Sequence, residues 1–140
     1  NNPNSWPCWS FSNHDSMRIA SRVTKPSREI MKKLMELKGN ICIYQGEELG
    51  LQETEVKFED LQDPFGKNFW PEFKGRDGCR TPMPWNSNEI NLGFSEKKTW
   101  LPVNHDYAPK SVEQQKQNQD SMLNYTKELI KQRKRGFATQ

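Results

Sequence analysis

A short run of polar residues, Asn13-His14-Asp15, carries side chains of the types that catalytic sites use. It offers an amide that can donate and accept, an imidazole, and a carboxylate within a few residues. A carboxylate held in a water-poor pocket can stabilise positive charge that develops in a transition state. A His-Asp pair at the end of a strand is, however, more often a structural hydrogen bond, so the triplet alone is weak evidence for catalysis.

The elements around the triplet predict a strand–helix–strand unit. An aromatic, β-favouring run at about 6–12 precedes it, apolar residues at helical spacing indicate a helix over about 26–38, and a compact apolar strand follows at about 40–45. Pro26 starts the helix and Gly39 ends it. This order is typical of a parallel sheet in an α/β fold, where functional residues follow the carboxyl ends of the strands. We therefore expect a buried first strand with the polar triplet at its tip.

The remainder of the chain predicts a long loop and one more helix. Residues 50–110 show no clear periodicity and are rich in Pro, Gly, Asn and aromatic residues. Loops of this length are usually functional. An amphipathic helix follows at about 120–135, with Asp120 or Ser121 as its N-cap. Two strands cannot close a barrel, but they can supply the last quarter of one.

The composition indicates a piece of a larger domain. Only 32% of the 140 residues are hydrophobic and the mean hydropathy is -1.05, yet the chain has five Trp, seven Phe and nine Pro. Disordered chains are poor in aromatic residues. The sequence also lacks an apolar run of about 18 residues that could span a membrane. Aromatic loops with few apolar helices thus predict that the core partners lie elsewhere.

Charge and cysteines exclude several classes of function. The net charge is +3, and the cations Lys131, Arg133, Lys134 and Arg135 close a helix, so we expect no nucleic-acid partner. Cys8, Cys42 and Cys79 form no C-x-x-C pair, which disfavours zinc and a disulfide framework. No acidic cluster has the spacing of a calcium loop. We expect no cofactor and no metal, buried free thiols, and a cytoplasmic protein, although the missing N-terminus leaves a signal peptide open.

Four segments in order carry a resemblance to a known family. The run FSNHDSMRIASR (11–22) resembles the N-H-D motif that ends the seventh barrel strand in the α-amylase family of glycoside hydrolases, and IYQGEELG (43–50) resembles its eighth strand. RDGCRTPMPW (76–85) is similar to a segment of the α-glucosidase and oligo-1,6-glucosidase branch. WLPVN (100–104) and DSMLNYTKELIKQRK (120–134) resemble its approach to the eighth helix. Together they span nearly the whole chain.

The resemblance implies a fold and a set of roles. The fold is the C-terminal part of a (β/α)8 TIM barrel, strand 7 to helix 8, over residues 1–140. Asp15 would be the carboxylate that stabilises an oxocarbenium-like transition state, and His14 would donate a hydrogen bond to a sugar hydroxyl. Arg76, or alternatively Arg80, would hold a sugar hydroxyl and orient Asp15, and Asn13 is a weaker candidate for substrate binding. The nucleophile and the acid/base would lie upstream of Asn1.

The predicted function is that of a fragment of a retaining α-glucosidase acting on short oligosaccharides or disaccharides, inactive by itself. The alternative is a non-catalytic barrel that serves as the ancillary subunit of an amino-acid transporter. Glu47 and Glu48 resemble paired catalytic carboxylates, but the family implies that they hydrogen-bond nearby loops. Trp70, Trp85 and Trp100 could stack on sugar faces, although packing within the loop is commoner.

Overall fold

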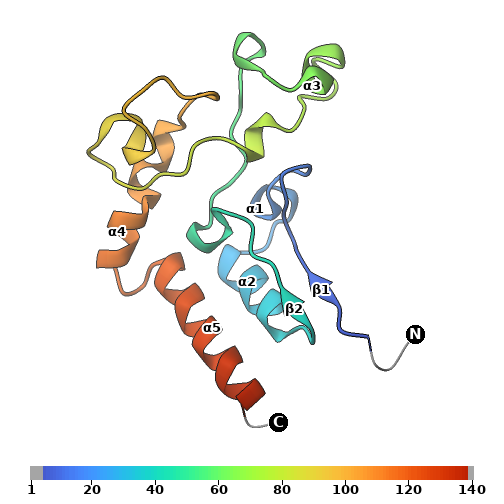
Figure 1. The fold of residues 1–140 in the computed structure, drawn as a ribbon, viewed down its shortest axis with the longest axis vertical. Helices are drawn as coiled ribbons and strands as arrows, with labels where there is room; N and C mark the ends of the chain where they lie inside the picture. The colour runs from blue at the N-terminus through green and yellow to red at the C-terminus, as the bar shows by residue number, and fades with distance from the viewer. Residues whose placement is uncertain (1–4, 139–140) are drawn as a thin grey trace.

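The computed structural model describes residues 5–138 and contains the predicted strand–helix–strand unit. Strands β1 (Cys8–Trp9) and β2 (Asn40–Ile41) pair in parallel, with Cys8 opposite Asn40 and Trp9 opposite Ile41. The connection between them contains α1 (Ile19–Arg22) and α2 (Ser27–Glu36), and α2 begins directly after Pro26 as predicted (Figure 1). The α/β character and the parallel pairing are confirmed.

The strands are shorter and more exposed than predicted. The ladder covers two residues in each strand rather than the ranges 6–12 and 40–45, and Cys8, Trp9 and Cys42 are exposed. The expectation of a buried first strand and of buried thiols is therefore wrong here, except for Cys79, which is fully buried. The reason is that, among the described residues, each strand pairs with a single neighbour, so its other edge is uncovered.

Helix α2 packs against the long helix α5 (Met122–Ala138), which the sequence predicted at about 120–135. The buried side chains of α2 are Met31, Leu34 and Met35, and Leu129 and Ile130 of α5 pack on them. Both helices were found from their apolar periodicity. The hydroxyl of Ser121 accepts a hydrogen bond from the backbone N–H of Asn124 at 3.2 Å, which selects Ser121 as the N-cap.

The segment 50–110 is more ordered than a plain loop. It contains the short α3 (Pro64–Asn68) and short 3-10 helices at Phe58–Asp60, Asp77–Cys79, Ile90–Gly93 and His105–Lys110. Another 3-10 helix, Glu47–Leu49, precedes the segment, and α4 (Val112–Gln117) follows it. A second core of Leu49, Leu51, Met83, Leu92, Tyr107, Val112 and Leu123 lies beneath it. Elements of three to six residues are too short to give a periodic signal, so the sequence predicted one long loop.

Arg133 joins α5 to the end of α2. Its guanidinium donates to the backbone carbonyls of Met35, Leu37 and Gly39, the Leu37 bond being 2.8 Å long. These carbonyls lie where α2 ends and the chain turns into β2, and the last carbonyls of a helix have no partner within the helix. The sequence assigned this arginine to a solvated helix end, whereas it caps a neighbouring helix.

The helices of the described residues include none that is long and apolar enough to cross a membrane.

We predict that Arg133→Gln, in the longer protein that the sequence indicates, lowers the free energy of unfolding by about 2–3 kcal/mol, because hydrogen bonds from a charged donor are lost. Urea unfolding followed by circular dichroism measures the change. Lys134→Gln is the matched control, since Lys134 is exposed on the same helix turn. Equal effects of the two substitutions would show that Arg133 does not cap α2.

Candidate active site around Asp15

The triplet Asn13-His14-Asp15 lies on the connection from β1 to α1, and Asn13 shapes it. The Asn13 side-chain oxygen accepts from the backbone N–H of Asp15 at 2.8 Å and from the Ser16 hydroxyl at 3.3 Å. Such a bond to a residue two positions on builds an Asx turn. This geometry gives Asn13 a local role that presents Asp15, with its side-chain oxygen already occupied.

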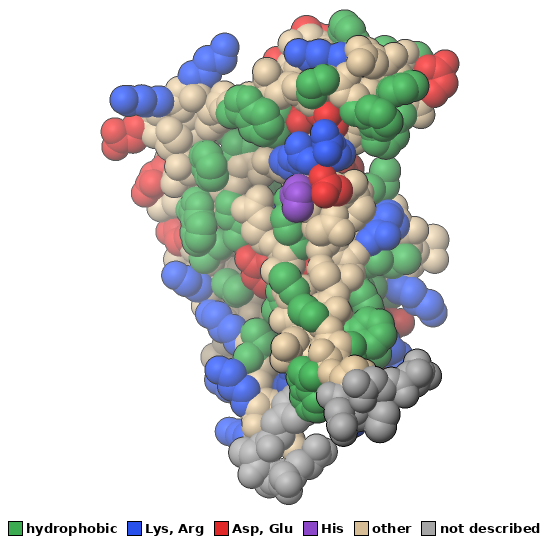
Figure 2. All heavy atoms as spheres, turned by 45° about the vertical axis from the view of Figure 1, so that its right-hand side comes forward, with side chains coloured by type: hydrophobic (Ala, Val, Ile, Leu, Met, Phe, Trp, Pro, Cys, Tyr) green, Lys and Arg blue, Asp and Glu red, His purple; other side chains and the backbone are tan. Residues whose placement is uncertain are grey.

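The Asp15 carboxylate contacts two arginines and a histidine. Its Oδ1 is 3.2 Å from Nη1 of Arg76 and 3.1 Å from Nη2 of Arg80, and its Oδ2 is 3.1 Å from Nε2 of His14. Arg80 also donates from Nε to the backbone carbonyl of His14 at 2.7 Å. Basic, acidic and histidine side chains gather on one face of the molecule (Figure 2). Both arginines that the sequence offered, Arg76 and Arg80, contact Asp15.

The Asp15 carboxylate is open to solvent on one side. Its side chain is 53% exposed and that of His14 is 70% exposed. A groove of about 440 Å³ begins at Asp15 and is lined further along by Glu53, Glu55, Glu72, Phe73 and Lys74. A hydroxyl-rich ligand could therefore reach Oδ2 and the imidazole while Oδ1 stays bonded to the arginines. The lining of this groove includes none of the three tryptophans named from the sequence; Trp70 packs on Phe58 with ring centroids 5.7 Å apart.

Sequence reasoning missed Asp63, which holds Arg76. Oδ2 of Asp63 accepts from Nε and from the backbone N–H of Arg76, and Oδ1 accepts from Nη2, all at 2.9 Å. These hydrogen bonds hold the pKa of the Asp63 carboxyl far below its usual range. The signal available in the sequence was Asp63-Pro64, because Asp before Pro is a helix-start signature and Asp63 is the N-cap of α3. The second partner, Arg76, could not be read from that pattern.

Arg18 ties the Asp15 segment to the rest of the site. Its buried guanidinium donates from Nη1 to the carbonyl of Gln45 at 2.5 Å and from Nη2 to that of Cys79 at 3.0 Å. Its backbone N–H donates to the Glu53 carboxylate at 2.8 Å, and burial raises the pKa of Glu53. Gly46 leaves the room that Arg18 needs, since a Cβ there would lie 2.7 Å from Nη1. Arg18 thus links β1–α1, the end of β2 and the segment that bears Arg76 and Arg80.

Glu47 and Glu48 bond to their own turn and not to Asp15. Glu47 accepts from the backbone N–H of Tyr44 at 2.8 Å, and Glu48 accepts from that of Gly46 at 2.7 Å. Burial raises the pKa of both carboxyls. Their bonds are those expected of residues that hold nearby loops. Within residues 5–138, no group of three or more His, Cys, Asp and Glu side chains is placed to hold a metal ion.

Comparisons with known proteins find a family model and relatives that match nearly the whole chain. The family model for "Alpha amylase, catalytic domain" matches residues 1–139. A probable α-glucosidase of Rhizobium meliloti (strain 1021) is 47% identical over 139 residues, which cover 94% of this chain and 25% of the relative. A probable oligo-1,6-glucosidase 2 of Bacillus subtilis (strain 168) is 35% identical over 92% of this chain and 27% of its own length.

Solved structures of related enzymes also match most of this chain. The α-glucosyl transfer enzyme XgtA matches with a TM-score of 0.84 and 47% identity, over 91% of this chain and 25% of that one. Trehalose-6-phosphate hydrolase of Bacillus licheniformis matches with a TM-score of 0.85 and 29% identity, over 93% of this chain and 28% of its own. The chain therefore spans about a quarter of the length of these proteins.

We predict that the destabilisation caused by Asp63→Asn depends on pH. The folded pKa of Asp63 lies below the value of about 3.9 for an unfolded aspartate, so its carboxylate stabilises the fold above that pH and this contribution is lost on acidification. The loss in free energy of unfolding should be largest near pH 6 and shrink toward about pH 3. Urea titrations at several pH values of the longer protein measure it, with the exposed Asp60→Asn as control. A pH-independent loss would contradict the prediction.

Proposed function

Because the chain belongs to the alpha-amylase catalytic-domain family, we propose that it forms the last part of the (β/α)8 barrel of a retaining α-glucosidase. In this proposal β1 and β2 are the seventh and eighth strands of that barrel, and α2 and α5 are its seventh and eighth helices. From the likeness to a probable α-glucosidase and a probable oligo-1,6-glucosidase, we infer that its substrates are terminal α-glucosidic bonds of disaccharides and short oligosaccharides. The observation that carries the proposal is the Asp15 cluster.

The proposed role of Asp15 is to stabilise the transition state. Retaining glycosidases pass through an oxocarbenium-like state between an acid/base and a nucleophile about 5–5.5 Å apart. Positive charge that develops on the sugar ring is stabilised by a carboxylate whose orientation is already fixed. Asp15 meets this need, since Arg76 and Arg80 both bond its Oδ1, His14 lies beside its Oδ2, and the side chain is still about half exposed. The nucleophile and the acid/base are assigned to the part of the enzyme that precedes this chain.

His14, Arg76 and Arg80 complete the proposed sugar contacts. The exposed His14 imidazole lies beside Oδ2 of Asp15, where it can donate to the same sugar hydroxyl that the carboxylate accepts from. Arg76 and Arg80 bring planar guanidinium forks, which hold a carboxylate in one orientation better than an ammonium does. The presence of this whole set, bonded together, favours an enzyme over a transporter-associated barrel without catalytic groups.

A second candidate function, glucosyl transfer, is favoured by the likeness to XgtA, an α-glucosyl transfer enzyme. Hydrolysis and transfer share the covalent glucosyl-enzyme and differ only in whether water or a second hydroxyl attacks it. Product analysis separates them. With maltose as substrate, hydrolysis releases glucose alone, whereas transfer also yields trisaccharides.

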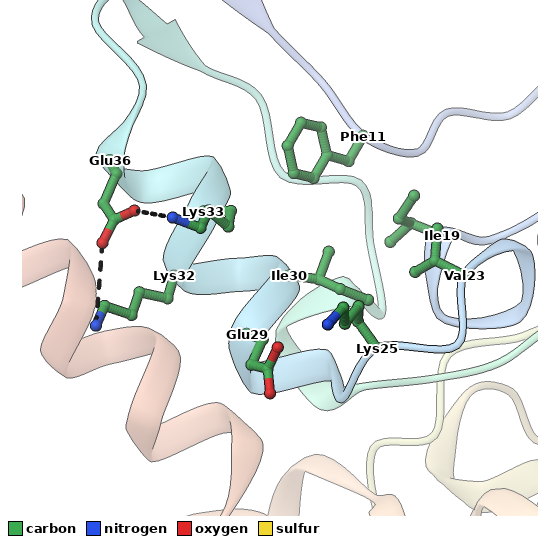
Figure 3. A pocket seen from close by; sticks show the side chains of 9 residues that line it. All are labelled: Phe11, Ile19, Val23, Lys25, Glu29, Ile30, Lys32, Lys33 and Glu36. Carbon is green, nitrogen blue, oxygen red and sulfur yellow. Dashed lines mark hydrogen bonds and ion pairs between the residues drawn. The ribbon is translucent and has the colours of Figure 1, made fainter.

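The face of the molecule near α2 supports the assignment to a larger barrel. Phe11, Ile19, Val23 and Ile30 point into a groove of about 520 Å³, and Lys33 and Glu36 form an ion pair at its rim (Figure 3). An open apolar groove along α1 and α2 is costly in water, because its surface stays hydrated. We assign its occupant to the preceding strand and helix of the same barrel, since the matched relatives are about four times as long as the chain.

We predict that Asp15→Asn lowers kcat of the full-length protein about 10²–10³-fold or more with the fold intact, because a charge-stabilising group is lost. Initial rates with p-nitrophenyl α-glucoside, together with a thermal unfolding curve, measure this. Asp106→Asn is the control, as Asp106 is exposed and far from the site in sequence. A near-wild-type kcat would remove Asp15 from the mechanism.

We also predict that residues 1–140, produced alone, neither unfold cooperatively in urea nor hydrolyse p-nitrophenyl α-glucoside. The physical reason is that, among residues 5–138, the apolar groove is open and each strand pairs on one edge only. In addition, two of the three carboxylates of the proposed mechanism are supplied elsewhere. The full-length protein assayed under the same conditions is the positive control. Measurable turnover by the purified fragment would overturn both the barrel assignment and the mechanism.

A further inference from the structure

We propose that Asp63 is a positioning residue for the candidate active site, acting on Asp15 through the guanidinium of Arg76. The inference rests on the proposed function and adds a residue that the resemblance did not point to. It starts from an unbroken line of contacts. Asp63 bonds Arg76, and Arg76 bonds Asp15, although Asp63 lies well away from Asp15 in the sequence.

The environment of Asp63 excludes direct contact with a ligand. Its side chain is completely buried. Both oxygens are occupied, Oδ1 by Nη2 of Arg76 and the backbone N–H of Phe65, and Oδ2 by Nε and the backbone N–H of Arg76. A buried carboxylate with every lone-pair direction used by protein donors has nothing left for substrate. Any effect of Asp63 on catalysis must therefore pass through Arg76.

The shape of arginine makes this transmission effective. The Nε and Nη2 edge of Arg76 is held bidentately by Asp63, and the guanidinium is planar and rigid. Fixing one edge thus aims the opposite nitrogen, Nη1, which is the atom 3.2 Å from Oδ1 of Asp15. Without Asp63 the same side chain could rotate about several bonds. The Asp15 carboxylate would then lose Arg76, one of the two arginine donors that orient it.

The segment around Asp63 is itself held in place. Asp77 is fully buried, and its Oδ2 accepts from the backbone N–H groups of Gln62 at 2.6 Å and Asp63 at 2.8 Å. Gly75 has a φ of +79°, and a Cβ there would lie 3.0 Å from Oδ2 of Asp63 and 2.8 Å from the Cα of Gly66. Only a glycine fits this close approach without strain. Asp77 and Gly75 therefore hold the backbone of Asp63 in the position from which its side chain bonds Arg76.

Arg80 provides an internal contrast. It reaches the same Oδ1 of Asp15, but its Nε is held by the carbonyl of His14 rather than by a carboxylate. Its orientation depends on the Asp15 segment itself and not on Asp63. Loss of Asp63 should consequently remove the contribution of Arg76 and leave that of Arg80. This difference makes the proposal testable by coupling.

The test is a double-mutant cycle in the full-length protein. Asp63→Asn should lower kcat about tenfold to a hundredfold, as expected when a positioning contact is lost, with KM changed by less than about threefold. Combined with Arg76→Gln, it should add nothing to the loss caused by Arg76→Gln alone. Combined with Arg80→Gln, the two losses should multiply. Asp60→Asn, an exposed carboxylate on the same segment, is the matched control.

Two outcomes would overturn the proposal. One is a loss from Asp63→Asn that multiplies with that of Arg76→Gln, because Asp63 would then act on the fold in general. The other is wild-type kcat in Asp63→Asn while Asp15→Asn is inactive, which removes this inference and leaves the proposed function standing. A wild-type protein inactive on every α-glucoside tested would instead remove the proposed function.

Arg76→Lys covers the case in which Asp63→Asn does not fold. Lysine keeps the positive charge but cannot hold Asp63 with one edge and Asp15 with the other. It should be as slow as Arg76→Gln. A wild-type kcat in Arg76→Lys would show that the fork is not needed, and the proposal would fail.

Discussion

The guanidinium of Arg76, shared between a buried and an exposed carboxylate, is the interaction on which the site depends. Asp63 takes one edge of the fork and Asp15 receives the remaining nitrogen. An arginine can do this because its donors are coplanar and always charged. The Asp63–Arg76 pair joins the segment that follows β2 to the connection between β1 and α1, and Arg76 reaches the Asp15 carboxylate from 61 positions further along the chain.

Arginines bonded to backbone carbonyls serve a similar purpose elsewhere. Arg18 donates to the carbonyls of Gln45 and Cys79, and Arg133 donates to those at the end of α2. In each case a single cation donates to several backbone carbonyls, and buried carbonyls need such hydrogen-bond partners. A chain with short elements and modest cores gains order from such links. They help so polar a sequence, with a mean hydropathy of -1.05, to hold the candidate site in a defined geometry.

The regular elements were predictable, and the ordered segment between them was not. Apolar residues recur at helical spacing in α2 and α5, because each helix buries one face, and that periodicity is visible in any sequence. The stretch between Leu51 and Lys110 packs through elements of three to six residues around Tyr107 and Leu92. Such short elements bury single side chains, so the apolar residues show no regular spacing in the sequence. The exposure of Cys8 and Trp9 was likewise hidden, since burial depends on neighbours that the local sequence does not reveal.

The sequence by itself determined the residue types of the site and the family they resemble. Asn13, His14, Asp15, Arg76 and Arg80 were all identifiable from their motifs, because local order carries the side-chain chemistry. Only the tertiary structure decided that both arginines reach Asp15, that Asn13 is used in a turn, and that Asp63 stands behind Arg76. The physical reason is that hydrogen-bond partners depend on how distant segments approach in space. A carboxylate and a guanidinium 13 positions apart leave no joint pattern in the sequence.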